Sequence, residues 1–190
     1  MKPSTPTGGS KLGVATIPAY LVCTIWAVYL LDIALPCHLN AYGIVPRTFR
    51  GLAGILFSNF LHVGLGHLIS NTVPLFVLSL LLILFYPRIF FQVIAVIIGC
   101  GGMLVWIFAR SANHIGASML IYGLTAFLVS YGLMKKKIIP ALVSIFVAFV
   151  YGAGMLGGLL PHGFISWEGH LFGAVGGGIA AYLLRMSEAD

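Results

Sequence analysis

The chain has 190 residues, of which 60% are hydrophobic and only 7% are charged, and its mean hydropathy is +1.07. A soluble domain carries roughly a quarter charged residues, so this composition excludes an ordinary soluble protein and indicates an integral membrane protein. The net charge of +6 does not indicate nucleic-acid binding, because Lys and Arg occur singly or in one triplet between apolar segments, as topology signals do. The three cysteines are widely spaced and form no metal-ligand or disulfide pattern. We therefore expect a membrane domain without a metal or other cofactor.

The order of polar and apolar segments predicts an all-α protein with six transmembrane helices. Residues 1–13 are polar and rich in Ser, Thr, Pro and Gly, which predicts a disordered cytoplasmic tail, and residues 14–190 are expected to form one membrane domain. The first apolar segment is about twice as long as a signal-peptide core, so it is interpreted as a retained span. Segments long enough to cross a bilayer are 14–35, 68–86, 89–109, 118–134, 138–158 and 170–185.

The segment 37–66 does not fit the pattern of a spanning helix. It is too long for a tight turn, and its apolar stretch 52–65 is interrupted by Ser58, Asn59 and His62. We expect a structured loop that lies partly in the membrane interface rather than a seventh span.

The distribution of basic residues predicts that both termini are cytoplasmic. With the N-terminus inside, seven Lys and Arg residues lie on the cytoplasmic side and three outside. The inner set is Lys2, Lys11, Arg88, Lys135, Lys136, Lys137 and Arg185, and the outer set is Arg47, Arg50 and Arg110. Compact size and the lack of a transit peptide indicate the inner membrane of a prokaryote.

In this orientation, the second, fourth and sixth spans all begin on the outer side and bring polar residues to one depth. These residues are His67 and Asn71, Ser118, and His170. Polar groups within a membrane are costly and mark functional sites by default. The convergence follows from topology alone.

The same residues favour serine chemistry over other ways of catalysing a reaction in the membrane. Among the few carboxylates only Asp32 lies within a predicted span, which excludes a pair of catalytic aspartates, and no HExxH zinc motif occurs. The lysines lie in the tail or at the cytoplasmic surface, so a Ser–Lys dyad is also excluded. Histidine remains as the general base for a serine nucleophile, since its ordinary pKa is near 6.5.

Ser118 and His170 each have neighbours suited to such a dyad. Ser118 begins a helix, where the helix dipole and free N–H groups favour an oxyanion, and Gly116 permits a close or strained turn before it. Tyr122 follows one turn later on the same face, where its ring can pack against His170. Around His170, the small residues Gly169, Gly173 and Gly177 allow two helices to approach closely.

Taken together, these motifs resemble the rhomboid family of intramembrane serine proteases. The matching segments are Gly116-Ala117-Ser118 with Tyr122, His67 to Asn71, and His170 to Gly173 followed by Gly177. Their order, the six-span architecture and the outward placement also match, from about residue 14 onward. The resemblance implies a rhomboid-like bundle and an endopeptidase.

The resemblance also implies a role for each site residue. Ser118 would be the nucleophile and His170 the base, without an acidic third member, while the Ser118 N–H, His67 and Asn71 would form the oxyanion site. Gly116, Tyr122 and Gly173 would support them. The substrates would be single-pass transmembrane proteins, cleaved near their outer end after lateral access past the second and fifth spans.

Further expectations concern the parts around the dyad. The loop from Leu159 to Gly169 would form a flexible cap over the site. The family's GxSG motif has Met119 at its last position here, which predicts a narrower substrate site or a displaced backbone. The family's Trp-Arg pair is also missing from the first loop, where Phe49 and Arg50 are only loosely comparable, and this affects anchoring of the loop.

Each candidate taken alone also has a structural interpretation. Ser118 could be a helix N-cap, His67 or His170 an interfacial histidine bonded to a carbonyl, and Asn71 a contact between helices. The other histidines of the outer side, His38, His62, His114 and His162, are interpreted as loop residues. The alternative function is a catalytically inactive rhomboid-like protein that binds transmembrane helices. A small channel or transporter is disfavoured, because intramembrane charges are lacking.

Overall fold

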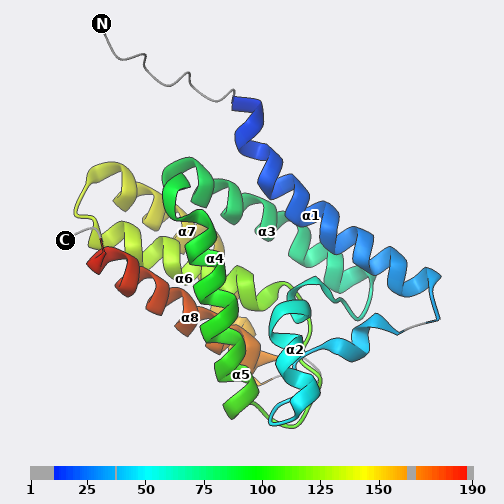
Figure 1. The fold of residues 1–190 in the computed structure, drawn as a ribbon. Coiled ribbons are helices and arrows are strands. Elements are labelled where there is room, and N and C mark those ends of the chain that lie inside the picture. The colour runs from blue at the N-terminus through cyan, green and yellow to red at the C-terminus, as the bar shows by residue number, and fades with distance from the viewer. Residues whose placement is uncertain (1–10, 37, 162–165, 188–190) are drawn as a thin grey trace, which may run out of the picture.

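The computed structural model describes residues 11–36, 38–161 and 166–187, and this part of the chain is all-helical (Figure 1). Its one β-type contact is an isolated bridge between Ile44 and His114. The predicted disordered tail lies outside the described residues up to residue 10, and residues 11–13 already belong to the first helix. The predicted loop residue His162 also lies outside the described residues.

The six apolar segments predicted as spans each fall on a long helix or a continuous series of helices. The long helices are α1 (Lys11–Ala34), α3 (Leu65–Phe85), α6 (Ser118–Met134), α7 (Ile138–Gly158) and α8 (Trp167–Met186). Between α3 and α6 the chain runs through η3 (Pro87–Ile89), α4 (Phe90–Val96), the π-helical η4 (Ile97–Gly101) and α5 (Gly102–Phe108).

Four of these helical segments are long and apolar enough to cross a membrane. They are Gly13–Ala34, Leu65–Phe85, Pro87–Phe108 and Ile138–Gly158. The helix α6 is apolar but has only 17 residues, and α8 carries Glu168 and Arg185 near its two ends. The chain is therefore a multi-pass helical membrane protein, as predicted, and six crossings stay a prediction.

The short helix α6 forms the centre of the bundle. It is apolar on all sides, and a helix of that kind is stable only when other helices surround it. Leu124, Phe127 and Leu128 are fully buried against α3, α7 and α8. By contrast, α1 lies at the edge of the bundle and packs along α3 (Figure 1). The start of α6 is thus held between several helices.

The first loop is structured, as expected, and holds no seventh span. It contains η1 (Leu39–Tyr42), the nine-residue α2 (Phe49–Phe57) and η2 (Ser58–Phe60). A helix of nine residues extends only about 14 Å, which is half the thickness of the hydrocarbon core. The exposed apolar side chains of Phe49, Leu56 and Val63 suit a position in the membrane interface.

The loop is anchored by Arg47 and Trp106 rather than by the Phe49–Arg50 region compared above. The Arg47 guanidinium donates to the carbonyl oxygens of Ile107 and Ala109 at 3.0 and 2.9 Å. The Trp106 indole N–H donates to the Thr48 carbonyl at 2.8 Å. These bonds join the loop to the end of α5, beside the segment that leads to Ser118.

Candidate active site

Ser118 is the first residue of α6, and the turn before it requires glycine. Gly116 has φ of +122°, a conformation that side chains other than glycine rarely adopt. A Cβ atom at Gly116 would also lie 2.5 Å from Cε1 of His67, so the glycine lets the imidazole approach the turn. Both predicted reasons for a glycine at this position are confirmed.

Ser118 is not a helix N-cap, which removes one structural interpretation. The N-cap is Ala117, which offers no side-chain bond to the helix. Instead the turn is held from the first loop: the Gly116 N–H donates to the Ser58 carbonyl at 2.9 Å, and the Ala117 N–H donates to Nε2 of His62 at 3.4 Å. The Ser118 side chain is half-buried at the end of this turn.

The four polar residues predicted to converge line one cavity of about 660 Å³. His67 and Asn71 reach it from the first turns of α3, Ser118 from the start of α6 and His170 from the start of α8. Its remaining walls come mainly from α3, α6 and the second half of α7. Three helices thus bring the predicted site residues to one cavity, and α7 completes its wall.

His170 is held by two contacts that fix both its orientation and its tautomer. Its ring stacks on Tyr122 with 4.1 Å between centroids and 5° between planes, which confirms the packing predicted from the spacing of Ser118 and Tyr122. Its Nδ1 lies 2.7 Å from the carbonyl oxygen of Gly158 at the end of α7. Since a carbonyl only accepts, Nδ1 carries the proton, and Nε2 of the neutral ring is left with a lone pair.

The same turn of α7 also accepts a hydrogen bond from Tyr122. The Tyr122 hydroxyl donates to the Met155 carbonyl at 3.0 Å, so Tyr122 and His170 together satisfy two carbonyls that the helix end leaves unpaired. The structural interpretation of His170 as a histidine bonded to a carbonyl is therefore correct for Nδ1. Between the described residues Ser118 and His170 there is no hydrogen bond.

Asn71 is bonded within its own helix, and it has no hydrogen bond to another helix among the described residues. Its Nδ2 donates to the His67 carbonyl at 2.7 Å, and the side chain is buried while still lining the large cavity. An amide has two N–H groups, so one remains for a ligand in the cavity. The His67 ring lies beside that of His62, with 5.1 Å between centroids.

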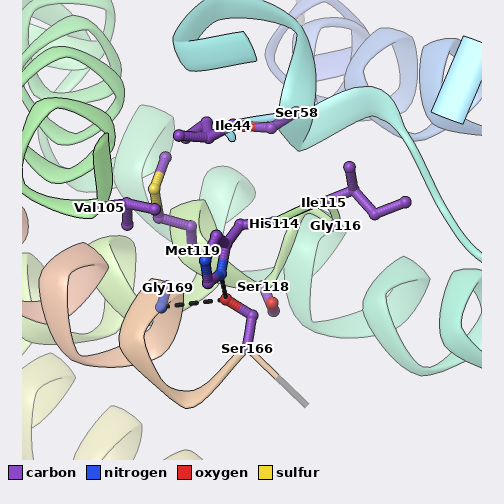
Figure 2. Close-up of a pocket in the computed structure, with 10 residues that line it drawn as sticks. All are labelled: Ile44, Ser58, Val105, His114, Ile115, Gly116, Ser118, Met119, Ser166 and Gly169. Carbon is purple, nitrogen blue, oxygen red and sulfur yellow. Dashed lines mark hydrogen bonds between the residues drawn. The ribbon is translucent and has the colours of Figure 1, made fainter. Parts of the chain in front are cut away.

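Behind Ser118 lies a second, much smaller cavity of about 10 Å³, close to the volume that one water molecule needs (Figure 2). At its edge, Ser166 caps α8 by accepting the Gly169 N–H at 3.2 Å and contacts Nδ1 of His114 at 2.6 Å. Nε2 of His114 lies 3.0 Å from the Arg110 carbonyl, so Nε2 donates and Nδ1 accepts the Ser166 hydroxyl proton. This network ties the segment before Ser118 to the start of α8.

Two histidines in the loops around the site have lowered pKa values. Burial, with a contribution from the nearby His67, lowers the pKa of His62 to about 4. Burial also lowers the pKa of His114, although its bond to the Arg110 carbonyl and the Glu168 carboxylate act in the opposite direction. Both rings are therefore neutral near pH 7, and the Ala117 N–H bond that Nε2 of His62 accepts requires this of His62.

Glu168 is a buried carboxylate near the start of α8. Its Oε1 lies 3.5 Å from Nε of Arg110 and accepts the Arg110 backbone N–H at 3.4 Å. It therefore binds the same loop that the Ser166–His114 contact holds. No group of His, Cys, Asp and Glu in the described part of the chain is arranged to hold a metal ion.

The predicted close approach of α8 to α6 occurs at Gly173 and Gly177. A Cβ at Gly173 would overlap the Met119 carbonyl oxygen, and one at Gly177 would overlap the Gly123 carbonyl oxygen. Gly169 does not take part in this contact, because a Cβ there would meet only Ser166. Of the three glycines, Gly173 and Gly177 therefore allow α6 and α8 to pack closely.

Met119 points away from the large cavity. Its side chain is buried with Ile44, Ile55 and Val105 in a small apolar cluster beneath the first loop, and it lines only the small cavity (Figure 2). Among the described residues that line the large cavity, Met119 is not present, so it does not narrow that cavity as expected.

Several contacts at the site were not predicted from the sequence. His62 and His114 were interpreted as loop residues, Gly158 was given no part, and Ser166 and Glu168 were predicted only as members of a flexible cap, although Glu168 lies in the first turn of α8 and Ser166 caps that helix. The spacing Ser166 to Gly169 is a capping signal that could have been recognised, whereas the two histidines and Gly158 have no local pattern. Of the predicted cap, Leu159 to Gly169, residues 162–165 lie outside the described part.

Fold and site together define a multi-pass helical membrane protein with a serine and a histidine in one cavity, and comparison with known proteins supplies the family. The sequence pattern described as the Rhomboid domain matches residues 50–187, so the chain belongs to the rhomboid family. An uncharacterized protein of Mycobacterium tuberculosis is 37% identical over 203 residues, covering 98% of this chain and 84% of the relative. An uncharacterized protein of Mycobacterium leprae is 35% identical over 200 residues, covering 98% of this chain and 78% of the relative.

Proposed function

We propose that this chain is an intramembrane serine endopeptidase that cleaves transmembrane helices near their outer end with a Ser118–His170 dyad. The main support for the proposal is the tautomer of His170, whose side chain lines the same cavity as Ser118. Because Nδ1–H is bonded to the Gly158 carbonyl, Nε2 is the nitrogen left to accept the serine proton.

In this mechanism Ser118 Oγ attacks the scissile carbonyl while His170 Nε2 takes its proton. The imidazolium then gives that proton to the leaving amine, and a water molecule activated by the same nitrogen hydrolyses the acyl-enzyme. The Gly158 carbonyl accepts from Nδ1–H throughout. With the negative end of the α7 dipole, it stabilises the imidazolium where other proteases use a carboxylate.

The oxyanion of the tetrahedral intermediate would form at the N-terminus of α6. The Ser118 N–H is in the first turn of that helix, where N–H groups have no partner within the helix. The second Nδ2–H of Asn71 and the His67 ring line the same cavity and serve as further donors.

Substrates are proposed to be single-pass transmembrane proteins that reach the dyad from the lipid between α3 and α7. Both helices pack on α6 and both line the large cavity, yet over the described residues they pack little against each other. That boundary is the predicted path past the second and fifth spans.

The location we propose is a bacterial cell membrane, with six crossings, cytoplasmic termini and the dyad near the outer face. Support comes from the mycobacterial source of the relatives and from the seven-to-three distribution of basic residues. The 17 residues of α6 give a length of about 26 Å, which suffices for a crossing when neighbouring helices surround it.

A fluorophosphonate probe tests the nucleophile. The purified protein in detergent should be labelled, Ser118→Ala should remove the labelling, and Ser70→Ala, which alters another serine of the cavity, should keep it. Labelling that persists in Ser118→Ala would refute the assignment. His170→Ala should abolish cleavage of a transmembrane substrate, and cleavage by that folded variant would require another base.

The alternative is a rhomboid-like protein without catalysis that binds transmembrane helices. The observation in its favour is that Ser118 and His170, both described, are not hydrogen-bonded to each other. Wild-type protein that binds a transmembrane peptide but neither reacts with the probe nor cleaves the peptide would establish this alternative.

A further inference from the structure

The end of the bundle opposite Ser118 contains a third cavity, of about 350 Å³, with a strongly basic lining. Three cations face it: Arg88, Lys135 and Lys137. Arg88 lies on η3, which joins α3 to α4, whereas the lysines lie on the turn between α6 and α7. Two segments far apart in the sequence therefore bring their charges to one concave site, which a signal for topology alone does not require.

The turn that carries the two lysines has a defined shape. Lys136 between them has φ of +50°, the left-handed conformation that ends a helix abruptly. The ammonium group of Lys135 lies 4.8 Å from the centroid of the Tyr131 ring, a cation–π distance. Lys136 does not line the cavity, so the turn directs Lys135 and Lys137, but not the residue between them, to the cavity.

Among the residues that the structure describes, those lining this cavity carry positive charges and no negative one. Of the carboxylates that the structure describes, Asp32 binds Asn40 and Glu168 binds Arg110 near the opposite end of the bundle. Burial and the charge of Lys137 lower the pKa of Lys135, which is the expected sign for cations held close together. An anion in the cavity would relieve that repulsion.

Apolar side chains surround the basic cavity. Phe85 forms part of its wall, and the neighbouring Leu133, Ile138 and Ile139 are exposed on the bundle surface. In a membrane protein such residues contact acyl chains, while aromatic residues and cations at helix ends lie at the headgroup level. The cavity therefore lies where a phospholipid places its phosphate.

We propose that this cavity binds the phosphate-bearing headgroup of an anionic phospholipid, with its acyl chains along the apolar surface beside it. A guanidinium binds phosphate oxygens in a bidentate manner, and the two ammonium groups add point charges. A zwitterionic headgroup would bring a further cation to three existing ones, so a net negative lipid is favoured. The inference depends on the membrane fold and not on the proposed protease activity.

Native mass spectrometry of the full chain tests this proposal by titration with phosphatidylglycerol and, separately, with phosphatidylcholine. Each cation beside an anionic headgroup contributes to the free energy of lipid binding. The loss of two of them in K135Q/K137Q is therefore expected to weaken phosphatidylglycerol binding roughly thirtyfold. The matched control is K136Q/R185Q, which removes two charges predicted to lie on the same side but outside the cavity, and its affinity should stay within about twofold of wild type.

Three results would overturn the proposal. The first is an equal loss of phosphatidylglycerol affinity in both double variants, and the second is equal affinity of the wild type for phosphatidylcholine and phosphatidylglycerol. The third is an increase in the thermal unfolding midpoint with inorganic phosphate alone that is as large as with the lipid, which would make the site one for free phosphate. Thermal unfolding without lipid checks that the variants fold. If K135Q/K137Q does not, then K137Q, which keeps the contact of Lys135 with Tyr131, must still lose lipid affinity.

Discussion

A methyl group added at Gly158 should disable the site, whereas the same change at Gly157 should not. A Cβ at Gly158 would overlap the Tyr122 hydroxyl and lie 3.1 Å from Nδ1 of His170, while a Cβ at Gly157 would have no neighbour within 4 Å. Both positions are helical, so Gly157→Ala is a matched control for the effect of alanine on the α7 backbone.

The magnitude follows from the bonds that the new methyl group displaces. The Tyr122 hydroxyl must leave the Met155 carbonyl, a loss of about 1 kcal/mol, and alanine in place of glycine in a helix returns roughly 0.5–1 kcal/mol. The free energy of unfolding should therefore change little. The displaced Tyr122 ring, however, no longer stacks squarely on the imidazole, which must itself shift by a few tenths of an ångström, so the bond that fixes its tautomer is misaligned. Since a positioned general base contributes about 10²–10⁴ in rate, kcat should fall about 100-fold.

The assay is cleavage of a transmembrane substrate in detergent, with thermal unfolding of each variant measured in parallel. We expect Gly157→Ala to match wild type in both measurements and Gly158→Ala to match it only in thermal stability. If folded Gly158→Ala cleaves as fast as wild type, the Gly158 carbonyl does not orient the base. Equal loss in both variants would instead assign the effect to the α7 backbone.

Two further predictions concern the oxyanion site and the loop before the serine. Asn71→Ala should lower kcat by about 10²–10³-fold, the effect of losing one oxyanion donor. Ser70→Ala removes a bond to the same His67 carbonyl and should leave kcat unchanged, and equal rates in both variants would exclude Asn71 from the oxyanion site. The pKa of His62 is about 4 in the folded protein and ordinarily 6.5, so between these values the folded state binds fewer protons than the unfolded state. The contribution of neutral His62 to stability is therefore present above pH 6.5 and is lost as the pH falls toward 4. Between pH 7 and pH 5 wild type should lose about 2 kcal/mol more than His62→Gln, seen as a larger fall in the unfolding midpoint, and parallel curves would contradict this reasoning.

The sequence was sufficient for those parts of the site that depend on topology and helix periodicity. Three helices that begin at the same end of the bundle bring Ser118, His170 and Asn71 to one cavity, and the four-residue spacing of Ser118 and Tyr122 places the tyrosine ring against the histidine. Both arguments need only the direction of each helix and its repeat.

What the sequence did not predict depends on contacts between segments without a repeat. The acceptor for His170 lies 12 residues earlier on another helix, and the acceptor for the Ala117 N–H is a histidine 55 residues away. The direction of Met119 depends on the apolar cluster beneath the first loop, which forms only when that loop folds onto α5. Lone histidines and a methionine after a serine carry no pattern that indicates such partners.

The bond between His170 and the Gly158 carbonyl joins proton transfer to the position of a helix at the lipid boundary. Because the acceptor belongs to α7, any displacement of that helix away from α8 lengthens the bond that fixes the imidazole tautomer. By thermodynamic reciprocity, a positive charge on the ring must in turn draw the end of α7 toward α8. In the proposed protease, a substrate helix that displaces α7 would therefore change the ionisation of His170 without contacting it.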